Sequence, residues 1–276
     1  MTSARYVLVL LTLTVPPSAV AAQTPAQPTL ILSIIGGVST SATLWDVERQ
    51  PLCVLLGQSC SNSYDTLRVT RDITPGIVAG VMGTLFRGSH VGVSLEVLYI
   101  GLPLDDTCTR VDTVPDPGAD PVYGSRNAQL CLNVSGASLS TSVISVNGGV
   151  TIRAAPRGSF SPYLRGGVGF TSYSTSTTEL SGDFVQNGQL ESRAVVVDPH
   201  PKSFGVSAQV AAGFTEKLGP GYQFRLEVQD ALIPLQQLTG PANDLAQAPR
   251  STKVFHRLAL RFGLDVVLEQ KRGRRY

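Results

Sequence analysis

The chain has 276 residues, of which 42% are hydrophobic and 15% are charged, and 22 Lys and Arg oppose 20 Asp and Glu. A net charge of +2 at neutral pH excludes the strongly basic surface on which nucleic-acid binding depends. No apolar run approaches the roughly 20 residues that a membrane-spanning helix needs, so a helical membrane protein is excluded as well.

The N-terminus has the pattern of a secretion signal. Arg5 supplies a positive start, residues 6–15 (YVLVLLTLTV) form an apolar core, and Ala19-Val20-Ala21 is a small-residue cleavage site. We therefore expect a signal peptide over residues 1–22 and a short linker over residues 23–28. The alternative, a membrane anchor, is less favourable because the apolar core is too short to span a bilayer.

Eight segments alternate apolar residues with polar or small ones, which is the pattern of strands with two different faces. They cover residues 30–39, 76–86, 91–100, 141–153, 160–173, 203–215, 222–230 and 257–268, and Ile31 and Ile35 are exceptions within the first. The last segment, RLALRFGLDVVL, is the most regular and has one entirely apolar face that includes Leu260. Its length suits a tilted strand that crosses a bilayer, about 9–11 residues, so we expect the apolar face to lie against lipid.

The connections between these segments alternate strictly between long and short. Short turns fall at residues 87–90, 156–158 and 216–221, and long connections at about 40–75, 101–140, 174–202 and 231–253. We expect the first long connection to be irregular. Aromatic residues gather near segment ends, as the interfacial girdles of a membrane barrel require; they are Phe86, Tyr99, Phe160, Tyr173, Phe204, Phe214 and Tyr222.

These patterns predict an all-β fold, an eight-stranded antiparallel up-and-down transmembrane β-barrel over residues 29–268. Short periplasmic turns and long extracellular loops are typical of such barrels. A basic tail over residues 269–276 is expected in the periplasm, either in contact with an anionic lipid or polymer or simply solvated. A soluble β-sandwich or lipocalin-like barrel is the alternative, because alternation by itself occurs there too.

Residues 161–170 (SPYLRGGVGF) resemble the Pro-Tyr…Gly-x-Gly-aromatic strand of the small eight-stranded outer-membrane barrels of Gram-negative bacteria, a family similar to outer membrane proteins A and X. The last segment resembles the assembly signal of that family at Arg261, Gly263, Val266 and Leu268. It departs from the signal in having Leu268, followed by EQKRGRRY, where the family has a terminal aromatic residue. The resemblance implies the outer membrane of the bacterial cell, contact with its lipid and with the assembly machinery, and a monomer.

Export permits disulfide bonds, and the chain contains four cysteines with three ways to pair them. We expect Cys53 to pair with Cys60 and Cys108 with Cys131, because each pair lies within one connecting segment. The alternative is four free thiols. The spacing does not match a metal site.

An eight-stranded barrel leaves an interior only wide enough for side chains to fill. The charged residues predicted to point into it are Glu96, Arg153, Arg165, Arg225, Glu227, Arg261 and Asp265. Counted from the periplasmic turns, Glu96, Arg165 and Glu227 lie at similar heights, and Arg225 and Asp265 share a lower level on neighbouring strands. Because an unpaired charge is costly in such an interior, we expect a lumen charge network that closes the barrel to ions.

The sequence contains no motif for catalysis, a metal or a cofactor that rises above background. His90, His200 and His256 fall at turn or loop positions, and Asp198, His200 and Ser203 are too close together in sequence to preorganise a triad. We therefore expect a non-enzymatic protein with a structural role or a surface role in binding an extracellular ligand. A narrow pore or carrier for small molecules is the first alternative, and a barrel-borne hydrolase or acyltransferase is the second.

Overall fold

The computed structural model describes residues 28–52, 65–113, 115, 119, 121–136, 139–156, 158–243 and 245–269. Residues 1–27, with the expected signal peptide, and residues 270–276 of the expected tail lie outside this range. The strands are β1 Thr29–Ser39, β2 Ala42–Leu52, β3 Asp65–Ile73, β4 Gly76–Phe86, β5 Val91–Asp112, β6 Leu139–Arg153, β7 Phe160–Tyr173, β8 Leu180–Gln186, β9 Gln189–Val196, β10 Phe204–Gly219, β11 Tyr222–Leu238 and β12 Arg250–Glu269, and the helix is α1 Arg126–Gly136.

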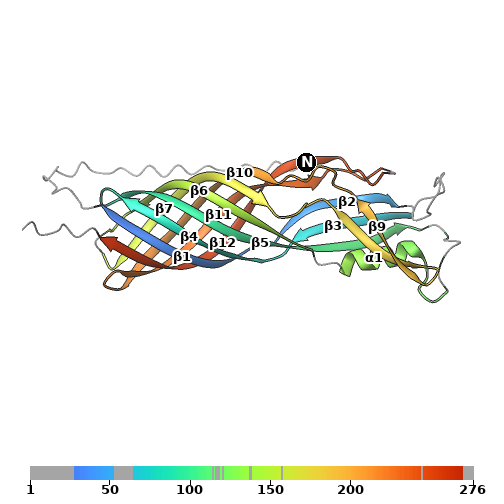
Figure 1. Cartoon of the computed structure of the whole chain (residues 1–276), viewed down its shortest axis with the longest axis horizontal. Helices are drawn as coiled ribbons and strands as arrows, with labels where there is room; N and C mark the ends of the chain where they lie inside the picture. The colour runs from blue at the N-terminus through green and yellow to red at the C-terminus, as the bar shows by residue number, and fades with distance from the viewer. Residues whose placement is uncertain are drawn as a thin grey trace, which may run out of the picture.

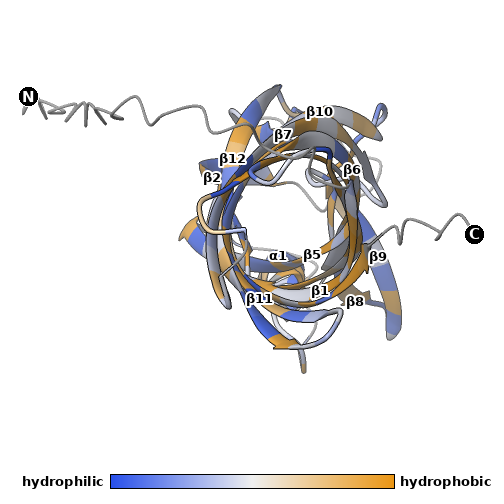
Figure 2. Ribbon diagram, turned by 90° about the vertical axis from the view of Figure 1, so that its left-hand side faces the viewer, coloured by the Kyte–Doolittle hydropathy of each residue, from blue (hydrophilic) through white to orange (hydrophobic). Residues whose placement is uncertain are grey.

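Eight of these strands form a closed antiparallel ring. The order around it is β1, β4, β5, β6, β7, β10, β11 and β12, and β12 pairs again with β1 over eleven residue pairs from Thr29↔Glu269 to Ser39↔Ala259. The view along the ring shows the strands enclosing one interior (Figure 2). The eight segments that alternate in the sequence supply these strands, so the predicted up-and-down barrel is confirmed.

The outer surface of the ring is apolar and its interior is charged. On β12, Leu258, Leu260 and Phe262 are 49%, 50% and 56% exposed, whereas Arg261 and Asp265 are buried. A soluble barrel has the opposite pattern. The outward apolar residues of β12 run from position 258 to 268, a height of about 25 Å for a strand tilted by about 40°, which equals the apolar band of outer-membrane barrels. The chain is therefore an outer-membrane β-barrel protein, and the soluble alternative is wrong.

Within the part of the chain that the structure describes, no helix is long and apolar enough to cross a membrane.

Three barrel strands extend well beyond the membrane band, on the side opposite the short turns (Figure 1). β5 runs to Asp112 and β11 to Leu238, so the predicted ends near residues 100 and 230 are too early. β12 begins at Arg250, so its predicted start at residue 257 is too late. The extensions are stable as strands because they stay paired: β11 pairs with β12 up to Leu238↔Arg250, and β3 pairs with β5 from Thr66↔Asp112 to Ile73↔Leu104.

The first long connection was expected to be irregular, and this expectation is wrong. It forms the hairpin of β2 and β3. β3 joins the outer half of β5, so a three-stranded sheet continues the barrel wall outward. One face of this sheet is buried and packs on apolar residues from the other connections; the buried side chains are Leu44, Trp45, Val47, Leu67, Val69 and Ile73. The connections thus share a hydrophobic core outside the membrane.

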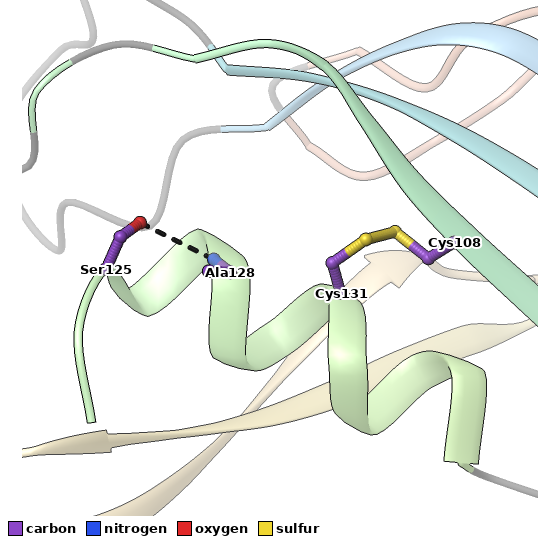
Figure 3. The surroundings of a disulfide bond; sticks show 4 residues. All are labelled: Cys108, Ser125, Ala128 and Cys131. Carbon is purple, nitrogen blue, oxygen red and sulfur yellow. Dashed lines mark hydrogen bonds between the residues drawn. A yellow bond between two sulfur atoms is a disulfide. The ribbon is translucent and has the colours of Figure 1, made fainter.

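The second and third long connections supply α1 and the β8–β9 hairpin, which cover this core. Ser125 caps α1, since its hydroxyl accepts from the Ala128 amide at 3.4 Å, and Cys131 of the helix forms a disulfide with Cys108 of β5 (Figure 3). A Cβ on Gly182 of β8 would lie 2.7 Å from the helix, so a glycine there lets the hairpin pack directly on α1. We call β2, β3, α1, β8, β9 and the outer ends of β5, β11 and β12 the extracellular domain.

Two of the aromatic residues expected in the lipid-facing girdles point inward instead. Phe86 and Tyr173 are buried, whereas Tyr99, Phe160, Phe204 and Tyr222 are exposed as predicted. The reason is the alternation of side chains along β4: Phe86 follows Met82 and Thr84 at every second position, and all three point inward. Gly92, which is opposite Phe86 on β5, leaves room for its ring. Ile31 and Ile35, the exceptions to the alternation, also lie inside the barrel.

Candidate functional site

Four charged side chains from four different strands meet in the middle of the barrel. Arg165 Nη1 donates to Glu96 Oε2 at 2.8 Å, and Arg165 Nη2 donates to Glu227 Oε1 at 2.8 Å. Arg261 Nη2 donates to Glu96, and Arg261 Nε lies 3.4 Å from Glu227 Oε1. All four side chains are 1% exposed. Each arginine therefore contacts both carboxylates, which makes a closed ring of charges across the lumen.

Neutral polar side chains complete this ring. The Tyr163 hydroxyl donates to Glu227 at 2.8 Å, and Gln209 Nε2 donates to Glu96 at 2.7 Å. Gln229 in turn links Gln209 to Arg261, since it donates to Gln209 and accepts from Arg261. A buried charge network is stabilised when its remaining hydrogen-bonding positions are filled, and these three side chains fill several of them.

A second charged pair lies nearer the periplasmic end. Arg225 Nε and Nη2 donate to the Asp265 carboxylate at 3.0 and 2.8 Å, and both side chains are almost fully buried. The Arg225 guanidinium also lies 4.9 Å from the centre of the Tyr163 ring, so the pair contacts the ring of charges above it.

Arg153 does not join the network, although it was expected to. Its Nε donates to the Ser89 carbonyl at 2.6 Å, and its guanidinium lies 3.9 Å from the centre of the Phe86 ring. Arg153 is the last residue of β6, so its side chain lies at the periplasmic rim and is only partly buried. The carboxylates of the network are several residues further up the strands.

The interior above the charge network holds little open space. A cavity about the size of one water molecule lies among side chains of β5, β6, β10 and β11. It is lined by Leu98, Ile100, Ser145, Asn147, Ser207, Ala208, Gln209, Gln229, Ala231 and Ile233. The charge network and the side chains around this cavity therefore extend across the lumen.

The wall of the barrel contains one seam. β10 and β11 stop pairing at Ala208 and Leu232; beyond this point β10 stays with β7 while β11 stays with β12. The Tyr173 hydroxyl crosses the seam and donates to the Pro234 carbonyl at 2.7 Å. A small cavity remains there, lined by Tyr173, Thr177, Lys202, Pro234, Leu235 and Gln236. The seam is thus closed by side chains rather than by a backbone ladder.

A buried ion pair joins the extracellular sheet to the third long connection. Arg71 of β3 donates to both oxygens of Asp106 of β5 at 2.6 and 2.8 Å, and neither side chain is exposed. Arg71 Nη1 and Trp45 Nε1 both donate to the Thr177 carbonyl, at 3.0 and 3.1 Å. These contacts fix residues 174–180 against the β2–β3–β5 sheet.

The fourth long connection is fixed in the same way. Asp198 is buried, pairs with Arg250 at the start of β12, and accepts from the hydroxyls of Ser176 and Thr178 at 2.5 and 2.8 Å. His200 is exposed, and only its backbone amide bonds to Asp198, at 3.2 Å. The Asp198 carboxylate therefore holds the third and fourth connections together. It does not contact the His200 side chain as the acid of a triad would.

The other histidines are also placed at the rims of the barrel. His90 Nδ1 lies 2.9 Å from the Arg153 carbonyl in a periplasmic turn. His256 Nδ1 lies 2.7 Å from Asp230 on the outer surface, where the lipid-facing band ends. Among the described residues there is no group of three His, Cys, Asp or Glu side chains that could hold a metal ion.

The residues that resemble the assembly signal all lie on β12. Arg261 and Gly263 point inward, Leu268 is on the outer face, and Val266 is partly exposed on that face. Arg261 therefore also contacts the carboxylates of the charge network in the folded barrel.

The outer surface of the extracellular domain carries charged pairs and exposed apolar side chains. Arg68 donates to Asp46 and holds the pKa of that carboxyl below its usual value, and the Thr70 hydroxyl donates to the same group at 3.1 Å. Large exposed apolar side chains lie around α1, at the start of β9 and in the fourth connection; they are Val122, Tyr123, Leu132, Leu190 and Leu245.

The Cys108–Cys131 disulfide encloses a separation of 23 residues. Changing both cysteines to Ser is expected to destabilise the extracellular domain by about 2–4 kcal/mol, because the open chain regains conformational freedom. Hydrogen exchange of α1 should speed up while the barrel amides are unchanged.

Cys53 and Cys60 lie outside the described residues, and their pairing stays a prediction. Mass mapping without reductant tests it, and a bridge from either of them to Cys108 or Cys131 would contradict it.

No protein-family model matches the sequence, and no curated protein matches it.

Solved structures of outer-membrane barrels do resemble the fold. OprG from Pseudomonas aeruginosa aligns at 12% identity with a TM-score of 0.46, over 89% of this chain and 98% of OprG. Ail, the attachment invasion locus protein of Yersinia pestis, in complex with the heparin analogue sucrose octasulfate, aligns at 11% identity with a TM-score of 0.36, over 88% of this chain and 100% of Ail. The outer membrane protease OmpT from Escherichia coli aligns at 10% identity with a TM-score of 0.34, over 89% of this chain and 98% of OmpT. At these identities the likeness concerns the fold alone.

Proposed function

We propose that this protein is a closed barrel that presents a folded extracellular domain to a partner outside the cell. One observation carries the proposal: all four long connections contribute to a single domain whose hydrophobic core continues into the outer end of the barrel, above a lumen crossed by the charge network. Ordered connections on a rigid barrel are a common place for binding. A channel, in contrast, needs an open interior.

The exposed side chains favour a protein as the partner. Tyr123, Leu132 and Leu190 are 61%, 73% and 71% exposed on the extracellular domain. Aromatic and large apolar side chains are enriched where proteins bind proteins, with a polar rim around them. The charged pairs of the β2–β3–β5 sheet, such as Asp46–Arg68, would form such a rim.

Adhesion of cells that carry the protein tests this proposal. Cells with the wild type are expected to bind surfaces coated with extracellular-matrix proteins better than cells without it, and the Tyr123→Ser/Leu190→Ser variant should lose at least half of the gain. Leu218→Ser is the matched control, because Leu218 is a similarly exposed apolar residue at the periplasmic end of β10. Equal adhesion of all four kinds of cell would contradict the proposal.

A carrier for small molecules is the second candidate, and the seam between β10 and β11 favours it. Pro234 has no amide hydrogen with which to pair β11 to β10 at this place, so a wall opening would break only side-chain contacts such as Tyr173–Pro234. The closed barrel predicts no steady conductance in planar bilayers and no uptake of small solutes by liposomes. Regular single-channel steps or uptake that rises in Tyr173→Phe would favour the carrier instead.

A non-enzymatic role is part of the same proposal. It predicts no turnover of acyl esters or peptides, and hence no effect of His90→Ala or His200→Ala on any residual rate. We also propose that the protein is a monomer without a cofactor, that it is inserted by the outer-membrane assembly machinery, and that it is similar to outer membrane proteins A and X. The proposal of similarity is supported by the ring of eight strands and the filled interior.

A further inference from the structure

One buried arginine inside the barrel lacks the carboxylate partner that the others have. Arg257 is on β12, four residues above Arg261, and is only 1% exposed. It stands opposite Ala231 of β11 at the outer end of the membrane band. The inward residues next to it on the two strands are the small Ala231 and Ala259 on one side and the large, buried Phe255 and Ile233 on the other, and none of them carries a charge.

The contacts of Arg257 are few and neutral. Its Nη2 donates to the Ser39 hydroxyl at 2.8 Å and to the Thr74 carbonyl at 3.4 Å. Its Nε and Nη1 are buried and have no hydrogen-bond partner. In the part of the chain that the structure describes, no carboxylate lies within ion-pair distance of Arg257.

The charges inside the barrel therefore do not balance. Glu96, Glu227 and Asp265 are paired with three arginines, and Arg257 is a fourth buried arginine without an acid. A buried cation is costly unless a negative charge lies beside it, and an arginine does not lose its proton to escape this cost. Water would satisfy the two donors but would leave the positive charge.

We propose that the barrel binds a small monovalent anion, of the chloride class, at Nε and Nη1 of Arg257. The ion accepts hydrogen bonds from these donors and balances the excess charge of the interior. The ion must be small and without a large organic part, because Arg257 is only 1% exposed and lies inside the barrel.

The stability of the purified, folded protein tests this site. A ligand that binds only the folded state stabilises it in proportion to the logarithm of its concentration, once that concentration exceeds Kd. In wild type, the thermal midpoint is expected to rise as chloride replaces gluconate at constant ionic strength. In Arg257→Met the midpoint should not depend on chloride. Arg153→Met is the matched control and should keep the wild-type dependence, because Arg153 lies at the other rim and bonds to a carbonyl.

A second measurement does not require a variant. Crystals of the wild type grown with bromide in place of chloride are expected to give an anomalous peak next to the Arg257 guanidinium. Equal midpoints in chloride and gluconate, together with no bromide peak, would overturn the proposal, and so would a chloride dependence that persists unchanged in Arg257→Met. A peak at Arg257 supports it even where Arg257→Met does not fold.

Discussion

Replacing Asp265 with Leu is expected to lower the free energy of unfolding of the barrel by about 3–5 kcal/mol. Arg225 keeps its charge and stays buried, with 5% of its side chain exposed, but loses all three of its hydrogen bonds to the carboxylate. Removing one partner of a buried pair costs more than the pair contributes, because the remaining charge has no counter-charge. The Tyr163 ring at 4.9 Å attracts the cation, but weakly.

The matched control is the double variant Arg225→Met/Asp265→Leu. Its apolar side chains occupy a similar volume and leave no charge unpaired, so it is expected to recover most of the loss. Urea unfolding in lipid bilayers measures all three proteins. A single variant as stable as wild type would contradict the buried pairing, and equal losses in the single and double variants would contradict the explanation by an unpaired charge.

The barrel could be predicted because its strands keep a strict period of two. On β12 each outward residue from Leu258 to Leu268 is apolar, and the inward positions 257, 261 and 265 are charged. The same period allowed the heights of charges to be counted from the turns. Glu227 and Arg261 are direct neighbours in the ladder, and Arg225 is diagonal to Asp265. The alternation read from the sequence therefore gives the correct face of each residue wherever the pairing between strands has no bulge.

The β2–β3 hairpin was missed because β2 does not keep this period. The ladder between β2 and β3 shifts register at two places, between Thr43 and Trp45 and again between Val47 and Gln50. Leu44 and Trp45 are consecutive and both buried. A bulge of this kind puts neighbours on one face and removes the alternation from the sequence. The strand is specified by its tertiary contacts, which a local pattern does not contain.

The β8–β9 hairpin, in contrast, did have a sequence signal. Asn187-Gly188 form its turn with φ of 53° and 75°, which is the backbone of the two-residue turn that Asn-Gly favours. The signal was overlooked within a long connection. Arg257 had no such signal, because the sequence places several arginines on inward positions and only the structure shows which of them has a carboxylate within reach.

Replacing Leu260 with Arg is expected to lower the free energy of unfolding by about 1–3 kcal/mol, between the costs at the bilayer midplane and at its interface. Leu260 is half exposed on the lipid face, and its neighbours in the two adjacent ladders, Val38 and Val228, are also outward and apolar. The guanidinium would enter the hydrocarbon with no partner, because Leu260 lies inside the apolar band, with Leu258 between it and the outer edge. Urea unfolding in bilayers of known thickness measures the loss.

Leu268→Arg is the matched control for depth. Leu268 has the same outward parity on β12 and is 45% exposed, but it lies at the periplasmic end of the apolar band. An arginine there reaches the lipid head groups, so the expected loss is only about 0–1 kcal/mol. Both variants introduce the same side chain, so the difference between their losses of stability measures the effect of depth in the membrane. Equal losses at both positions would contradict the placement of the band, because burial in hydrocarbon is the only property in which the two sites are expected to differ.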